Sequence, residues 1–269
     1  MATAKKRFGQ NFLIDPRKAE SLVHALELKP DEIVIEVGPG TGALTERILK
    51  TGANLIAVEL DRELISPLKE KFGRYSNFKI IESDFIKFDP GLLGVRNFKL
   101  IGNLPYNISG AMMEWLIAYN DLIQLAVITV QREVALRLKA LPGTRAYGSL
   151  SVMVQSYFDI RKLFDIPPGC FSPRPKVFSR ALCLRPDRKI DAQIRYEDFR
   201  DFMRGCFAQK RKTLANSIFA VGIAAGLNFS TRAQVENIIV AAGHDINVRA
   251  EQLSLNEFVE LYKLMQRLK

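Results

Sequence analysis

The chain reads Ile33-Val34-Ile35-Glu36-Val37-Gly38-Pro39-Gly40-Thr41-Gly42 at the point that decides its fold. A short apolar run ended by closely spaced glycines predicts a buried strand that turns directly into a helix ending near Lys50. Glycines let a ligand approach the backbone closely, and the start of the helix offers unpaired N–H groups. A tight strand-to-helix turn without a ligand is the alternative for such a loop taken alone.

Apolar runs of strand length alternate with helical patterns through most of the chain. We expect further strands at 54–59, 78–82, 98–102, 122–130, 160–166 and 178–184. We expect helices at 15–28, from Asp61 with a kink or a late start at Pro67, at 109–119, at 131–138 and beyond Gly148. Apolar strands that alternate with helices predict an α/β fold with a parallel sheet covered on both faces.

The polar, proline-marked segment 185–189 predicts a domain boundary. We therefore expect one domain over 1–187 and a second over 188–269. Everything in the second reads as helix, at 196–207, 213–220, 231–241 and 253–268. The last of these has an amphipathic pattern, which is typical of a helix packed on a core.

Composition narrows the class of protein. Hydrophobic residues make up 48% of the chain, which is ample for a packed core and excludes a disordered chain. No apolar stretch approaches the ~20 residues of a membrane span, so we expect no membrane partner. Cys170, Cys183 and Cys206 are dispersed and indicate neither a disulfide framework nor a zinc site. We therefore expect a cytoplasmic protein with no metal.

The net charge of +10 is unevenly placed along the chain. Residues 1–18 carry five basic side chains and one acidic, and residues 160–189 carry eight basic and two acidic. A solvated basic face is the ordinary explanation of such runs. The segregation nevertheless favours a footprint for a polyanion, and nucleic acid is the obvious candidate.

Polar side chains also follow the next three expected strands. Glu59 ends one strand 21 residues after Gly38, where a carboxylate can accept both hydroxyls of a ribose. Asp84 follows another and could accept from the amine of an adenine ring, with Phe85 packing nearby. Singly, a surface acid and a helix-capping Asp are the alternatives. Because the carboxyl ends of strands line the ligand crevice of open α/β sheets, we expect one site that includes Asn103.

The glycine loop contains no basic residue to clamp a pyrophosphate, which disfavours NAD and nucleoside triphosphates. Its spacing is G-x-G-x-G, whereas dinucleotide folds have G-x-G-x-x-G. A nucleoside without phosphates fits better, and S-adenosylmethionine is such a ligand. Glu36 would then lie near the methionine end, where it would hold the loop or the amino group.

Asn103-Leu104-Pro105-Tyr106 forms a corner after the strand 98–102. The Asn103 side-chain oxygen and the Pro105 carbonyl can each accept one hydrogen of an exocyclic amine, while the Tyr106 ring stacks on the base. A plain turn is the alternative, because Asn and Pro are common turn formers. The corner itself therefore predicts only an amine-bearing base.

Six motifs stand in one order along the chain: Gln10-Asn11-Phe12-Leu13, E-V-G-P-G-T-G, N-L-P-Y-N-I-S, Val130-Gln131-Arg132-Glu133-Val134-Ala135, Pro173-Arg174-Pro175-Lys176-Val177 and Gln209-Lys210-Arg211-Lys212-Thr213-Leu214. In these motifs the chain resembles the ribosomal RNA adenine dimethyltransferases over nearly its whole length. The resemblance implies a Rossmann-like class I methyltransferase domain, with a mostly parallel seven-stranded sheet, and a small all-α C-terminal domain. It also implies successive transfer of two methyl groups to the N6 amine of each of two adjacent adenosines in a small-subunit rRNA hairpin.

The resemblance implies three sets of site residues. The residues that would hold S-adenosyl-L-methionine, and its product S-adenosyl-L-homocysteine, are Gln10, Asn11, Leu13, Glu36, Gly38, Gly40, Glu59, Leu60, Asp84, Phe85 and Asn103. The target adenine would be held by Asn103, Pro105 and Tyr106, and Phe171 would cover its other face. The residues that would contact RNA are Lys5, Lys6, Arg7, Arg174, Lys176, Lys210, Arg211 and Lys212.

The implied partner is small-subunit rRNA in an immature ribosomal small subunit, bound by a monomer. Phe178 departs from the pattern, because a small or acidic residue is expected after Pro175-Lys176-Val177. A non-catalytic nucleic-acid-binding assembly factor on the same fold is one alternative. A methyltransferase acting on adenine in large-subunit rRNA or in DNA is the other.

Overall fold

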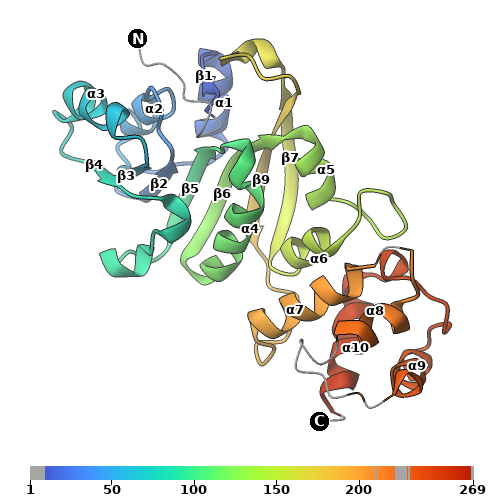
Figure 1. The fold of residues 1–269 in the computed structure, drawn as a ribbon. Helices are drawn as coiled ribbons and strands as arrows, with labels where there is room; N and C mark the ends of the chain where they lie inside the picture. Colours follow the sequence, from blue (N-terminus) through green and yellow to red (C-terminus); the bar gives the residue numbers. More distant parts are fainter. Residues whose placement is uncertain (1–9, 210, 222–228, 230, 268–269) are drawn as a thin grey trace. The chain divides into compact units, whose positions relative to one another are not determined.

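A seven-stranded sheet organises the first compact unit of the molecule. We describe the fold from a computed structural model, whose described residues are 10–209, 211–221, 229 and 231–267. The strand order across the sheet is β4-β3-β2-β5-β6-β9-β7 (Figure 1). The strands are β2 (Ile33–Val37), β3 (Asn54–Glu59), β4 (Phe78–Glu82), β5 (Phe98–Asn103), β6 (Ile123–Gln131), β7 (Phe158–Ile166) and β9 (Ser179–Pro186).

The directions of the strands show at which edge of the sheet a ligand crevice is expected. β2 pairs in parallel with β3 and β5, β4 continues in parallel from β3, and β6 continues in parallel from β5. β9 runs antiparallel to β6. The expected mostly parallel sheet of seven strands is therefore confirmed. The chain order reverses at β2, and open α/β sheets bind ligands at the carboxyl ends of the strands beside such a reversal.

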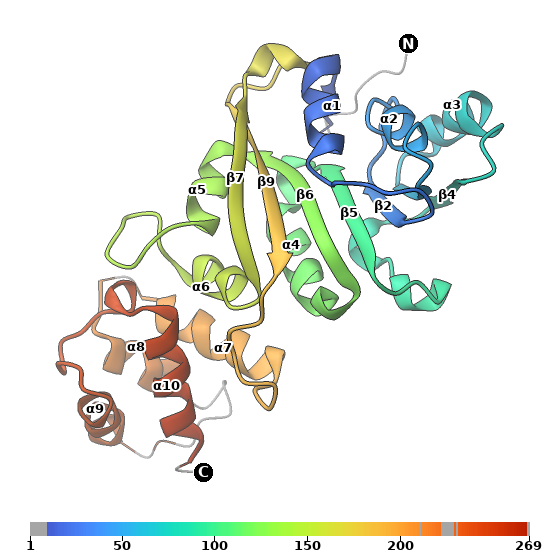
Figure 2. The ribbon, with the colours of Figure 1, turned by 180° about the vertical axis from the view of Figure 1, so that it is seen from behind.

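Helices cover both faces of this sheet. The helices of the unit are α1 (Pro16–His24), α2 (Thr45–Leu49), α3 (Arg62–Phe72), α4 (Ser109–Ala118) and the start of α5 (Arg132–Leu138). The first three pack on the face that carries Val34 and Ile101. On the other face, Trp115 of α4 packs against Phe98, with ring centroids 6.5 Å apart. Figure 1 shows the sheet from the α4 side and Figure 2 from the α1 side.

Two helix expectations need correction. The first helix ends at His24, not near residue 28. The chain leaves the helical conformation soon afterwards, since Glu27 has a φ of +51°, in the left-handed region. Of the kink or late start expected at Pro67, the late start is wrong, since Asp61 caps the helix and Arg62 begins it. The kink stays a prediction. Pro67 lies within the helix on an exposed position, where water can bond the carbonyl that its missing N–H leaves open.

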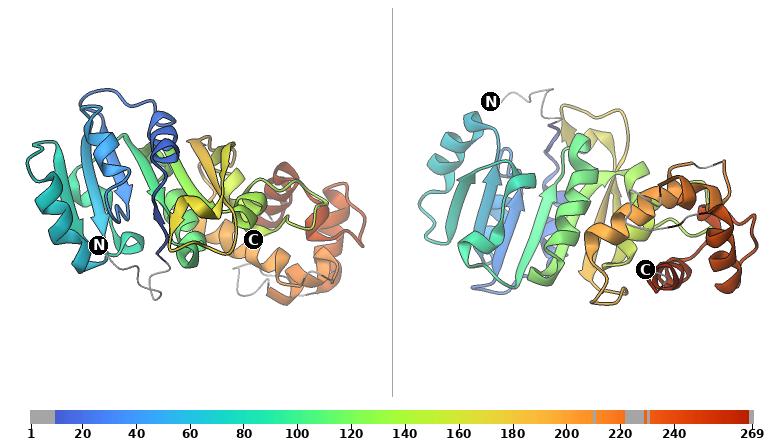
Figure 3. Two further views of the ribbon diagram at one scale, coloured as in Figure 1. Left: turned by 90° about the horizontal axis from the view of Figure 1, so that it is seen from above. Right: turned by 60° about the horizontal axis from the view of Figure 1, so that its bottom comes forward.

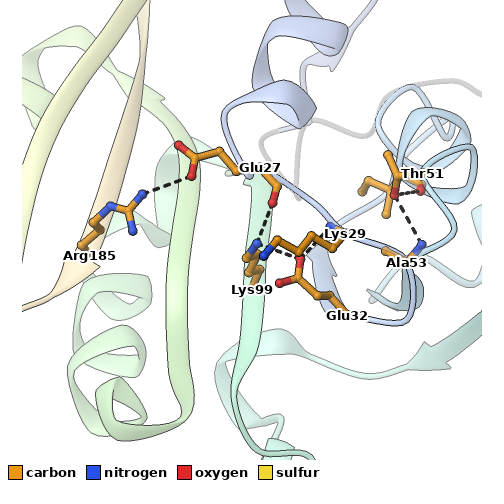
Figure 4. Close-up of polar contacts among 8 residues, drawn as sticks. Glu27, Lys29, Glu32, Thr51, Ala53, Lys99 and Arg185 are labelled. Carbon is orange, nitrogen blue, oxygen red and sulfur yellow. Dashed lines mark hydrogen bonds and ion pairs between the residues drawn. The ribbon is translucent and has the colours of Figure 1, made fainter.

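A polar cluster closes the amino ends of the strands (Figure 4). Lys99 in β5 is 8% exposed, and its Nζ donates to the Glu27 carbonyl at 2.9 Å and to Glu32 Oε2 at 2.8 Å. The Glu27 carboxylate lies 3.6 Å from the Arg185 guanidinium. Burial raises the pKa of Glu32, but hydrogen bonds from Lys99 and the Lys29 amide outweigh burial and hold it below its usual value. This end of the sheet is closed by the partly buried Lys99–Glu32 ion pair, with the exposed Glu27–Arg185 pair beside it.

The second compact unit is helical. It comprises Leu136–Phe158 together with Asp187–Lys269, and the first unit comprises Met1–Ala135 with Asp159–Pro186. Its helices are α6 (Ser149–Gln155), α7 (Tyr196–Phe207), α8 (Leu214–Val221), α9 (Arg232–Ala241) and α10 (Leu255–Gln266). Figure 3 shows α7 to α10 in orange and red. No helix in the described part of the chain is long and apolar enough to cross a membrane.

This division differs from the expected one at 187/188, because 136–158 groups with the C-terminal helices. Tyr147 shows why: its hydroxyl donates to the Leu253 carbonyl at 2.8 Å, and its ring packs edge-on against Phe207. Apolar side chains of α7 and α10 fill the remaining core, with the Phe199 and Tyr262 rings 5.5 Å apart. The small helical domain thus has a core of its own.

Candidate active site

One cavity opens at the carboxyl ends of β2, β3, β4 and β5. About 860 Å³ of empty space lies between its lining atoms, counting the open solvent at its mouth. It is lined by Gln10, Asn11, Phe12, Val37, Gly38, Gly40, Val58, Glu59, Leu60, Ser83, Asp84, Phe85, Asn103, Leu104, Pro105, Tyr106, Asn107 and Ile108. The structure therefore brings together most of the residues that the sequence assigns to the cofactor and to the target base.

The glycine loop forms the floor of this cavity beside β2. Gly38 and Gly40 have φ values of +62° and +57°, in the left-handed region that favours glycine. A Cβ on Gly40 would lie 2.8 Å from the Phe12 ring, whereas a Cβ on Gly38 would meet nothing within 4 Å. The Gly38 amide donates to the Val58 carbonyl at 2.9 Å, which ties the loop to β3. The loop is thus held close to Phe12 and leaves open space at Gly38.

Glu59 places a carboxylate in the cavity at the end of β3. Its Oε1 accepts from the Asp61 amide at 2.8 Å, and its Oε2 accepts from the Gly40 amide at 3.3 Å. Burial raises the pKa of Glu59, although these backbone donors act in the opposite direction. Each carboxylate oxygen has a further lone pair, so the group can still accept the hydroxyls of a ribose.

Asp84 and Phe85 continue the same wall after β4. Asp84 Oδ1 accepts from the Ile86 amide at 3.1 Å, so this residue both caps a short 3₁₀ turn and lines the cavity. The Phe85 ring packs against Trp115 with centroids 4.4 Å apart and is 5% exposed. Leu60 is 49% exposed at the rim. An acceptor beside an aromatic and an aliphatic surface suits a flat base that carries an amine.

Of the two roles expected for Glu36, holding the glycine loop or the cofactor amino group, its contacts fit the first. It is 1% exposed and, among the described residues, is not part of the cavity lining. Its Oε2 accepts from the Thr45 hydroxyl at 2.7 Å, which links β2 to α2 across the glycine loop. Burial raises the pKa of Glu36 to about 8, so the side chain is largely protonated at neutral pH. In this structure Glu36 supports the loop from behind.

The segment before α1 forms the wall facing the glycine loop. Phe12–Leu13 is a short strand, β1, which pairs antiparallel with β8 (Phe171–Ser172). Asn11 uses its carbonyl to accept from Asn103 Nδ2 at 2.7 Å. Gln10 and Asn11 line the cavity, while Leu13 is 5% exposed and lies in the core beneath it. Leu13 therefore supports the wall from below.

The Asn103 corner occupies the far side of the cavity. Asn103 donates through Nδ2 to Asn11, and its Oδ1 is buried with no hydrogen-bond partner among the described residues. The Pro105 carbonyl accepts from the Ile108 amide at 3.2 Å and keeps a second lone pair. The Tyr106 side chain lines the cavity, and its hydroxyl lies 2.6 Å from Ser179 Oγ. Two free acceptor positions and an aromatic ring therefore meet at one corner.

Phe171 does not lie in the cavity lining. It is 3% exposed and packs in the core cluster with Leu13, its partner across the β1–β8 pair. Its expected place over the second face of the target base stays a prediction.

The cations expected to contact RNA are only partly within the described residues. Arg174 and Lys176 are exposed between β8 and β9, and Arg211 and Lys212 are exposed before α8. Lys5, Lys6, Arg7 and Lys210 lie outside the described residues. Phe178 is 45% exposed directly before β9, so the residue that departs from the family pattern stands on the surface.

Sequence reasoning missed several residues of the lining. These are Phe12, Val37, Val58, Ser83, Leu104, Asn107 and Ile108. Val37 ends β2 beside Gly38, and Val58 stands beside Glu59, the last residue of β3, so their place along the strand was a usable signal. Phe12 stands between Asn11 and Leu13 in one of the six motifs, which was also a usable signal, but its approach to Gly40 depends on a strand pairing across most of the chain. No group of His, Cys, Asp and Glu side chains in the described part of the chain is gathered to hold a metal.

Comparisons with known proteins agree with this geometry. The family model described as "Ribosomal RNA adenine dimethylase" matches residues 1–265. Ribosomal RNA small subunit methyltransferase A of Syntrophotalea carbinolica is 42% identical, with 97% of each protein covered. The protein of the same name from Thermotoga maritima is 38% identical, over 98% of this chain and 86% of that protein.

A solved structure extends the comparison to the fold. A dimethyladenosine transferase from Plasmodium falciparum superposes with a TM-score of 0.81 at 25% identity, covering 95% of this chain and 98% of the other. The superposition therefore includes the helical unit as well as the sheet. The chain thus belongs to the ribosomal RNA adenine dimethylase family and is an S-adenosylmethionine-dependent methyltransferase.

Proposed function

We propose that this protein dimethylates the exocyclic N6 amine of two adjacent adenosines in a hairpin of small-subunit rRNA. The observation that carries the proposal is Asn103 Oδ1, a buried acceptor without a hydrogen-bond partner among the described residues, at the corner of the cavity. Buried polar atoms are normally paired, and an unpaired one in a cavity invites a ligand donor. An amine hydrogen of the target base would supply that donor.

The lining suits S-adenosylmethionine better than a phosphorylated cofactor. Among the described lining residues there are two carboxylates, Glu59 and Asp84, and no Lys or Arg. Glu59 would accept the ribose hydroxyls, and Asp84 would accept from the adenine amine beside Phe85. The open space at Gly38 and the backbone of Gln10 and Asn11 would receive the methionine end. When bound, the cofactor supplies a methyl group on a positively charged sulfur.

The residues of the corner would orient the target nitrogen. The adenine amine is a weak nucleophile because its lone pair is delocalised into the ring. Acceptance of its two hydrogens by Asn103 Oδ1 and the Pro105 carbonyl favours a pyramidal nitrogen whose lone pair points at the methyl group. Alignment of this kind contributes up to about 7–11 kcal/mol in favourable cases. Stacking on Tyr106 would add about 1–3 kcal/mol to holding the base.

The reaction requires no general base before the transfer. With the cofactor held by Glu59 and Asp84, the nitrogen lone pair would form the new N–C bond, and the electron pair of the broken C–S bond would stay on sulfur. The nitrogen then loses one proton to water. A second round requires the methylated amine to rotate, so that its remaining hydrogen again meets one of the two acceptors at the corner. Asn103, Pro105 and Tyr106 thus act by orientation.

The basic segments support an rRNA partner. Arg174 and Lys176 stand exposed between the strand of Phe171 and the strand of Ser179. Arg211 and Lys212 stand exposed in the helical unit, and cations of this kind position a phosphate backbone. We propose that the protein acts as a monomer on immature small subunits in the cytoplasm, where the free thiols Cys170, Cys183 and Cys206 stay reduced.

The test is methyl transfer from labelled S-adenosylmethionine to small subunits from cells that lack this modification. Digestion to nucleosides should show labelled N6-dimethyladenosine at two neighbouring positions. Naked rRNA and large subunits serve as controls, and both should take up far less label. Label on large subunits would favour the large-subunit enzyme, and RNA binding without any label would favour a non-catalytic assembly factor.

A further inference from the structure

The Tyr106 hydroxyl is tied to a residue that no motif assigned to the site. It lies 2.6 Å from Ser179 Oγ, and either oxygen can be the donor. Tyr106 begins the short 3₁₀ turn after β5, and Ser179 is the first residue of β9. The bond therefore joins two elements on opposite sides of β6, since the sheet order is β5-β6-β9.

Ser179 is a rigid anchor. It is completely buried, and it pairs with Gln131 in the antiparallel β6–β9 ladder. The residue before it is also held, because the Phe178 carbonyl accepts from the Arg132 amide at 2.9 Å. Tyr106, in contrast, is only half-buried and stands in a turn at the edge of the cavity. A ring in a turn needs an external contact to keep one orientation.

We propose that Ser179 is a positioning residue for methyl transfer, which holds the Tyr106 ring at the angle needed to stack on the target adenine. The proposal rests on the proposed function, because it needs a base at the corner. The hydrogen bond fixes the far end of the ring, while Pro105 restricts the backbone before it. Ring rotation is then blocked before the base arrives, so less entropy is lost on binding.

The hydrogen bond between Tyr106 and Ser179 also connects the stacking ring to the basic segment before β9. Residues 173–178 connect β8 with Ser179, and Arg174 and Lys176 are exposed within them. Ser179 therefore ends the basic segment and also contacts the stacking ring. The structure thus assigns to one hydroxyl the link between the ring that holds the base and the segment that would meet the RNA backbone. Cofactor contacts at Glu59, Asp84 and the glycine loop do not pass through this bond.

The test is a double-mutant cycle of Ser179→Ala and Tyr106→Phe, with methyl transfer to small subunits as the readout. Each single variant removes one partner of the same hydrogen bond and should lower kcat/KM for the RNA substrate by about 3- to 10-fold. The double variant should lose no more than the worse single variant. The Kd for S-adenosylmethionine should stay unchanged in all three, which a general loss of structure would not allow.

Two further variants make the cycle decisive. Ser179→Thr keeps the hydroxyl and should retain more activity than Ser179→Ala. Ser156→Ala removes another fully buried serine hydroxyl, bonded to the Val152 carbonyl in the helical unit, and should leave methyl transfer unchanged. If Ser179→Ala does not fold, Tyr106→Phe alone decides, because it removes the same bond from the half-buried side.

Independent losses that multiply in the double variant, or full activity of Tyr106→Phe, would overturn the role of Ser179 while leaving the proposed function intact. Failure of the wild-type protein to methylate small subunits in the same assay would overturn both.

Discussion

Asn103 combines two tasks in one side chain. Its Nδ2 is fixed by the Asn11 carbonyl at 2.7 Å, and that bond decides which end of the amide faces the cavity. Its Oδ1 is then left as an acceptor without a partner among the described residues. A buried acceptor of this kind costs free energy in the free protein, and a substrate amine recovers it on binding.

Asn103→Ala should lower kcat for methylation by about 100-fold or more, as loss of a pre-organised hydrogen-bonding group in an active site does. Binding of small-subunit RNA should persist, because Arg174 and Lys176 are untouched. The comparison is Asn54→Ala, which removes an amide that bonds the Asp31 carbonyl at 3.0 Å near the closed end of the sheet. Normal turnover by Asn103→Ala would contradict the role given to this residue.

Glu36 makes stability depend on pH in an unusual direction. Its pKa rises from 4.5 in the unfolded chain to about 8 in the folded protein, because burial disfavours the charged form. Between these values, folding takes up a proton. The wild-type protein should therefore lose stability as the pH rises from 4.5 to about 8, by at most about 1.4 kcal/mol per pH unit from this group.

Glu36→Gln should remove this part of the pH dependence, since glutamine is neutral and can still accept from the Thr45 hydroxyl. Urea unfolding of both proteins at pH 5.5 and pH 8.5 measures how their unfolding free energies change with pH. The unfolding free energy of the variant, relative to wild type, should be higher at the alkaline pH. An identical change with pH in both proteins would show that Glu36 is ionised in the folded state.

At the scale of elements, the glycine loop and β1 restrict one another. Gly38→Ala and Gly40→Ala introduce the same left-handed strain, about 1–2 kcal/mol for a residue with a Cβ. Only the Gly40 variant also places its methyl group 2.8 Å from the Phe12 ring. Gly40→Ala should therefore have the lower thermal unfolding midpoint of the two. Equal midpoints without cofactor would mean that β1 moves aside freely.

The parallel part of the sheet could be predicted from the sequence, and β1 and β8 could not. β2 to β6 are mostly apolar runs with clear ends, so each can be recognised from its own residues. β1 and β8 have two residues each and no periodicity, and they exist only because distant parts of the chain meet. The grouping of residues 136–158 with the helical unit escaped prediction for the same reason, since it depends on Tyr147 reaching Leu253.

The site residues also fall into those that the local sequence could place and those whose position depends on distant contacts. Glu59 and Asn103 end β3 and β5, and Asp84 lies two residues after β4, so the strand pattern alone places these residues at one sheet edge. Glu36 lies inside its strand, and the sequence could not show whether it faces the cavity or Thr45. Ser179 stands at the start of β9, which runs antiparallel to β6. No pattern near Ser179 in the sequence indicated its contact with Tyr106.

At the scale of the whole molecule, the basic segments that would bind RNA differ in charge from the cavity that would bind the cofactor. The net charge of +10 is concentrated in 1–18 and 160–189, whereas the described cavity lining holds carboxylates and no cation. A polyanion is thus attracted to the surface without competing for the cofactor cavity. Salt should therefore weaken RNA binding strongly and cofactor binding little.

Arg174→Gln and Lys176→Gln should each reduce the slope of log K against log salt for RNA binding by about 1, if each contacts one phosphate. Lys79→Gln is the matched control, because Lys79 is exposed on β4 near the amino end of the sheet. Titrations of small-subunit RNA across several salt concentrations give the slopes. Unchanged slopes for the first two variants would place the RNA elsewhere on the protein.

The β1–β8 pair also determines when, during synthesis, the wall of the cavity can form. Leu13 and Phe171 are 158 residues apart, so their pairing is among the most non-local contacts in the chain and carries a large loop-closure cost. The wall built from Gln10, Asn11 and Phe12 cannot close before residue 172 of 269 has been synthesised. A chain synthesised only as far as residue 170 therefore contains the glycine loop, Glu59, Asp84 and Asn103 but lacks the β8 partner of β1.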